Sequence, residues 1–61
     1  MDEREKRAGN LLSEIVKCET HKDLSATAAV AVGYYHSELI SREQYATIVK
    51  AGKQRRKELS Q

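Results

Sequence analysis

The chain has 61 residues, of which 33% are charged and 39% hydrophobic, and it contains no Phe, Trp or Pro. A chain this short buries only about 60% of the surface that its unfolded form exposes, so its stability is marginal. Cys18 is the single cysteine, which excludes an internal disulfide and leaves a partner chain as the remaining support for a small core.

The N-terminal segment, residues 1–7, is charged almost throughout. No apolar stretch behind it is long enough for a signal peptide or a membrane span. A lone cysteine also suits a reducing compartment better than a secreted setting. We therefore expect a soluble, cytoplasmic protein without membrane contact.

Residues 2–22 are predicted to form the first helix. Its apolar residues recur at helical spacing on one face, and polar residues fall opposite them. Acidic residues in its first turn and Lys22 near its end suit the two poles of a helix dipole. The helix is expected to end before a connection at residues 23–25, and its apolar face contains Ala8, Leu11, Leu12, Ile15 and Cys18.

A second helix is predicted over residues 26–37, with Ser25 as its N-cap. This segment is apolar on every side, and two neighbouring helices cannot cover such a helix completely. Its small residues would also allow another backbone to approach closely. The competing interpretation is a buried strand, which would lack a partner strand within the chain. We therefore predict a homodimer, with an interface formed by Ala28, Ala29, Val30, Val32, Tyr34 and Tyr35.

The strongest local signal predicts a third helix over residues 42–59. Ser41 can cap this helix, and Gln44 three residues later can bond back to it as a capping box. Ile40 before the cap and Tyr45 at the fourth helical position can add a hydrophobic staple. Gly52 is a weak point at which the last turns could fray.

Together these elements predict an all-α fold: a small three-helix domain spanning residues 1–61, with a helical hairpin, self-associated as a dimer. The expected shared core consists of Leu11, Leu12, Ile15, Val30, Val32, Tyr35, Leu39, Ile40, Tyr45, Ile48 and Val49.

A helix-turn-helix pattern competes with the hairpin over residues 25–44. Ala29, Gly33 and Leu39 match its small residue, its turn glycine and its buried aliphatic position. Arg42 departs from the pattern, because a buried apolar side chain belongs there. The Ser41 capping box would also start a helix within the supposed recognition helix, so the hairpin is favoured.

Cys18, His21 and His36 are residue types that bind zinc. A structural zinc site usually has paired ligands at two places, whereas here one Cys-x-x-His pair is joined by a single histidine. Cys18 and His21 likewise lack a group to orient the histidine for nucleophilic catalysis. The sequence therefore predicts a buried thiol and two surface imidazoles, with no metal, cofactor, small-molecule substrate or enzymatic activity.

The C-terminal third is the basic part of the chain, since residues 42–61 contain six basic and two acidic side chains. On a helical projection, five of the basic residues occupy about one third of the circumference. They are either contacts for nucleic-acid phosphates or a solvated helix face. We call these five residues the basic ridge: Arg42, Lys50, Lys53, Arg56 and Lys57.

Two functions follow as hypotheses. The first is a regulatory or adaptor module that self-associates through its central helix and docks on a protein partner. The alternative is a small helix-turn-helix-like DNA-binding regulator that uses residues 34–57.

Overall fold

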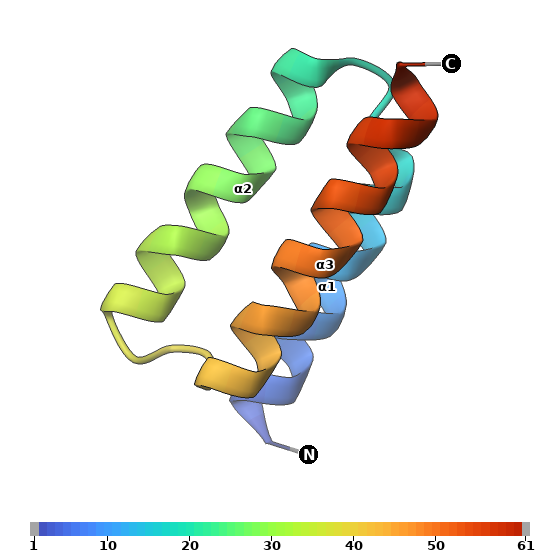
Figure 1. Ribbon diagram of the computed structural model, residues 1–61. Helices are drawn as coiled ribbons and strands as arrows, with labels where there is room; N and C mark the ends of the chain where they lie inside the picture. Colours follow the sequence, from blue (N-terminus) through green and yellow to red (C-terminus); the bar gives the residue numbers. More distant parts are fainter. Residues whose placement is uncertain (1, 61) are drawn as a thin grey trace.

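The computed structural model describes residues 2–60, so the two end residues of the predicted domain lie outside it. Three helices, α1 (Glu3–Lys17), α2 (His21–His36) and α3 (Arg42–Leu59), run up, down and up beside one another (Figure 1). The described residues contain no strand. The predicted all-α, three-helix fold is therefore confirmed, and the alternative of a strand in the second segment is wrong.

The core is narrow and draws on all three helices. It consists of Ala8, Leu11, Ile15, Cys18, Leu24, Ala31, Ile40 and Ile48. The partly buried residues packed against it are Leu12, Tyr34, Tyr35, Tyr45, Ala51 and Leu59.

Four of the predicted core residues lie outside this core in the single chain: Val30, Val32, Leu39 and Val49. Val30 and Val32 remain 43% and 39% exposed. Ala31, between them, is 1% exposed and occupies the inward position of α2. Because successive helical residues are turned by about 100°, its two neighbours point to opposite sides of the helix.

The first connection lies earlier in the chain than predicted. Helix α1 ends at Lys17, where Cys18 adopts an extended backbone, and α2 begins at His21. The Thr20 hydroxyl caps α2 by accepting a hydrogen bond from the Asp23 N–H at 3.1 Å. The predicted break at residues 23–25 is wrong, and Ser25 lies inside α2. The Thr20 cap satisfies a backbone donor in a segment for which the sequence predicts continuous helix.

The second connection agrees with prediction. The Gln44 N–H donates to the Ser41 hydroxyl at 3.1 Å, and the Ser41 N–H donates to the Gln44 side chain at 2.8 Å. This confirms the capping box and the start of α3. Ile40, in the staple position, is 2% exposed, and Tyr45 packs against the core. The second segment and α3 thus form a helical hairpin.

The helix-turn-helix interpretation is wrong for residues 25–44. Gly33, which would form its turn, lies inside α2. Helix α2 continues to His36 before the chain reverses into α3 (Figure 1). Gly52 similarly lies within α3, which continues to Leu59.

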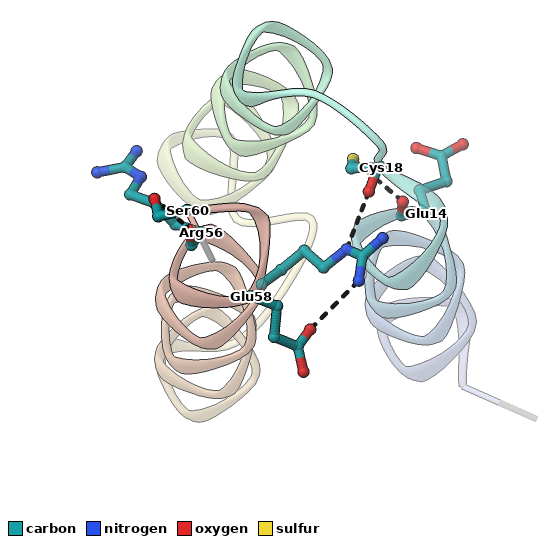
Figure 2. A network of polar contacts seen from close by, with 6 residues as sticks. Glu14, Cys18, Arg56, Glu58 and Ser60 are labelled. Carbon is teal, nitrogen blue, oxygen red and sulfur yellow. Dashed lines mark hydrogen bonds and ion pairs between the residues drawn. The ribbon is translucent and has the colours of Figure 1, made fainter.

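Each connection joins two helices and is held by an arginine from the remaining one. The first connection is held from α3 and the second from α1. Arg55 of α3 donates its Nε–H to the Cys18 carbonyl at 2.9 Å and pairs with Glu58 at 3.3 Å (Figure 2). Arg7 of α1 donates to the Leu39 carbonyl at 3.3 Å. These long-range bonds fasten the first chain reversal to α3 and the second to α1. None of the helices formed by residues 2–60 has the length and hydropathy that a membrane crossing requires.

Candidate interaction surface

Among the described residues, Cys18, His21 and His36 do not come together as a group that could hold a metal ion. The Cys18 thiol is buried and donates to the Glu14 carbonyl at 3.2 Å. His21 and His36 are exposed at the first and last positions of α2, which places them about 22 Å apart along the helix axis. Because of that separation, the two imidazoles cannot share one metal ion.

The six residues of the predicted dimer interface fall on different sides of α2. Ala28, Val32 and Tyr35 line hollows between α2 and α3. Val30 and Tyr34 line a hollow on the side facing α1. The sixth, Ala29, is exposed between these two sides. A single partner helix cannot contact all six, since Val30 and Val32 lie about 160° apart around α2.

Two neighbouring hollows lie between α2 and α3, and together we call them the α2–α3 groove. Both hollows are lined by Tyr45, Val49 and Lys53, so they meet at these side chains. The remaining residues that line the groove are Leu24, Ala28, Ala31, Val32, Tyr35, Arg42, Ala46, Ile48, Lys50, Gly52 and Arg56.

An aromatic pair lies in the part of the groove nearest the second connection. Tyr35 of α2 and Tyr45 of α3 stack with ring centroids 4.5 Å apart and planes inclined by 9°. Both rings also pack against the core, and they are half-buried. With Val32 and Val49 beside them, they give the groove an apolar floor. Neither helix alone indicates this pairing, because it depends on how α2 and α3 are placed against each other.

All five residues of the basic ridge are exposed. Four of them, Arg42, Lys50, Lys53 and Arg56, line the groove, and Lys57 lies outside it. None of the five takes part in an ion pair between residues 2 and 60. The charged residues found along the groove are thus all basic, and no ion pair within the described part of the chain neutralises them.

The sixth basic residue of the C-terminal third has a structural role. Arg55 turns toward α1 and holds the first connection, whereas the Arg56 side chain extends away from Cys18 and Glu58 on the outside of α3 (Figure 2). The helical projection correctly separated Arg55 from the basic ridge. It could not identify the Cys18 carbonyl as the partner, because that contact joins residues far apart in the sequence.

Comparison of the chain with protein-family models, with curated proteins and with solved structures finds no match. The function is therefore inferred from the geometry of the surface. An apolar groove bordered by cations is suited to binding another molecule through burial and charge.

Proposed function

We propose that the protein is a non-enzymatic regulatory or adaptor module that acts through protein–protein interaction. The observation that carries the proposal is the incomplete cover of α2. No charged residue occurs between Leu24 and Tyr35, yet within α2 only Leu24 and Ala31 are buried by the chain itself. An apolar helix left open in this way gains stability when another chain covers it.

Self-association through α2 is the first form of this function. The chain exposes 4611 Å², and a standard interface of about 800 Å² per partner would cover about one sixth of it. The part of α2 that contains Ala29 and Val30 is uncharged, so two copies can meet there without electrostatic repulsion. This interface uses Ala29, Val30 and Tyr34 of the predicted residues and leaves the α2–α3 groove open.

Sedimentation equilibrium tests self-association. At tens of micromolar, above the range in which a modest interface forms, we expect the mass of two chains. Val30→Asp should restore the mass of one chain, because it would force an unpaired charge into the apolar contact. Val16→Asp is the matched control, since Val16 on α1 is 69% exposed. The mass of a single chain for the parent protein would contradict self-association.

Nucleic-acid binding is the second candidate function, and the basic ridge is the observation that favours it. Lysine and arginine along one helix face give affinity for phosphates without sequence preference. On mixed-sequence duplex DNA, the slope of log affinity against log salt should be about −0.9 for each phosphate neutralised. Replacing Lys50, Lys53, Arg56 and Lys57 by Ala should flatten the slope by several units. Absence of binding at low salt would exclude this candidate.

A further inference from the structure

We propose that the α2–α3 groove binds an acidic amphipathic helix of a partner protein. The proposal rests on the protein-interaction function above and specifies the chemistry of the partner. It uses the side of α2 that contains Val32 and Tyr35, whereas the proposed self-association uses the side that contains Val30.

The two walls of the groove differ in charge. On α2, the groove is lined by uncharged residues such as Ala28, Val32 and Tyr35. On α3, apolar residues alternate with four exposed cations: Arg42, Lys50, Lys53 and Arg56. A complementary helix therefore has an apolar stripe that contacts α2 and the floor, with carboxylates along the edge that faces α3.

The spacing of the cations sets the length of the partner helix. Arg42 and Arg56 are fourteen positions apart on α3, which corresponds to about 21 Å along the axis. A partner helix that reaches both needs about four turns, with an acidic residue on each turn. The stacked Tyr35–Tyr45 pair and Val49 supply the apolar contact between these ends.

Charge disfavours a second copy of this chain as the occupant. A two-fold contact through the groove would bring the same basic residues of both copies together, with like charges across the interface.

The apolar floor disfavours nucleic acid. Phosphates would neutralise the cations, but Val32, Val49 and the tyrosine pair would then remain uncovered. An acidic amphipathic helix satisfies both features at once.

The binding test uses three designed peptides of about 18 residues, long enough to span the groove. The first carries Leu at positions i, i+3, i+4 and i+7 of a helix, which form one apolar stripe. It also carries Glu along one edge of that stripe. The second has Lys in place of each Glu, and the third is a scrambled sequence with the composition of the first. Titration calorimetry with the parent protein should give binding of the first peptide at least about tenfold tighter than that of the other two.

Charge reversal in the groove separates recognition from loss of folding. Lys53→Glu/Arg56→Glu should weaken binding of the acidic peptide by about tenfold or more and create binding of the lysine peptide. Lys6→Glu/Lys22→Glu makes the same change in net charge at exposed positions outside the groove, and it should leave both affinities within about twofold. An unfolded variant cannot acquire the new preference, so a reversal supports the proposal.

Val32→Ser tests the apolar wall. It should weaken peptide binding severalfold while leaving binding to duplex DNA unchanged, because DNA contacts only the cations. Equal binding of the first and scrambled peptides, or tighter binding of duplex DNA that the charge reversal abolishes, would overturn the proposal in favour of a nucleic-acid surface. No binding of the acidic peptide would also overturn it. Sedimentation of the protein without peptide reports self-association independently, so either idea can fail alone.

Discussion

The two connections of this bundle reverse the chain by different means. The second, residues 37–41, is specified by nearby residues: a reciprocal capping box at Ser41, a buried Ile40 before it, and paired backbone bonds at the end of α2. The first, residues 18–20, has one side-chain cap at Thr20 and a buried Cys18.

Both connections also depend on an arginine from the helix that they do not join, Arg55 of α3 for the first and Arg7 of α1 for the second, but not equally. The Arg55–Cys18 bond is shorter than the Arg7–Leu39 bond, at 2.9 Å against 3.3 Å. The connection with fewer local signals therefore has the stronger long-range restraint. A chain reversal that several nearby residues specify is easy to predict from the sequence. A reversal that a distant residue holds becomes evident only in the folded chain.

The largest effect is expected from the apolar residue of the second connection. Ile40→Ala should cost about 2–4 kcal/mol, since it leaves a cavity at a position that is 2% exposed. The whole domain has about 3–9 kcal/mol of stability at ordinary values per residue, so much of the variant would unfold at room temperature. Far-UV circular dichroism during urea titration measures the loss.

Cys18→Ala is the corresponding change in the first connection. It removes a single sulfur atom and should cost about 1 kcal/mol, close to the contribution of one buried methylene group. Equal losses for the two variants would contradict the view that Ile40 anchors its connection more strongly.

The second effect tests the arginine restraints. Arg55→Ala should cost about 1–2 kcal/mol, because it removes a charge-assisted hydrogen bond to the partly buried Cys18 carbonyl. Arg7→Ala should cost less, as its bond is longer. Arg56→Ala is the matched control: it removes the same side chain from the next position of α3, where it is exposed, and should change stability by no more than about 0.5 kcal/mol. If Arg55→Ala behaved like this control, the restraint would be unimportant.

The sequence was sufficient where the determinants are local. The Ser41 box predicted the start of α3, and helical projection predicted that the basic ridge shares one exposed face. It was insufficient for Val30 and Val32, because apolar character does not reveal that Leu24 and Ala31 take the inward positions of α2. The groove could not be predicted either, since its Tyr35–Tyr45 pair joins two helices whose relative placement is a tertiary property.

The third effect compares the two helix caps. Ser41→Ala should cost about 1 kcal/mol and Ser41→Gly only a few tenths, since glycine exposes the backbone donors to water. Thr20→Ala should cost no more than Ser41→Ala, because its cap lacks the reciprocal bond present at Ser41. Urea titration of the three variants checks this order. A greater loss for Thr20→Ala than for Arg55→Ala would show that the first connection depends on its cap more than on Arg55.

The smallest effect concerns the end of α2 and should be stabilising. Glu38 has a φ of 61°, a left-handed conformation that a side chain disfavours and glycine adopts readily. This conformation lets the Leu39 N–H donate to the Tyr34 carbonyl at 2.8 Å and the Glu38 N–H to the Tyr35 carbonyl at 3.1 Å, which is the Schellman arrangement in which glycine is preferred. Glu38→Gly should therefore raise the free energy of unfolding by about 0.5–1 kcal/mol.

Glu38→Ala is the control for this last variant, because it removes the carboxylate but retains a Cβ atom. Its stability should stay within a few tenths of a kcal/mol of the parent value, since the backbone strain persists. If both variants gained stability equally, the carboxylate would be the cause of the strain. If only the glycine variant gained stability, the left-handed backbone at Glu38 would be the cause of the strain. The strain would then be part of the tight reversal that places Ile40 in the core and Ser41 at the start of α3.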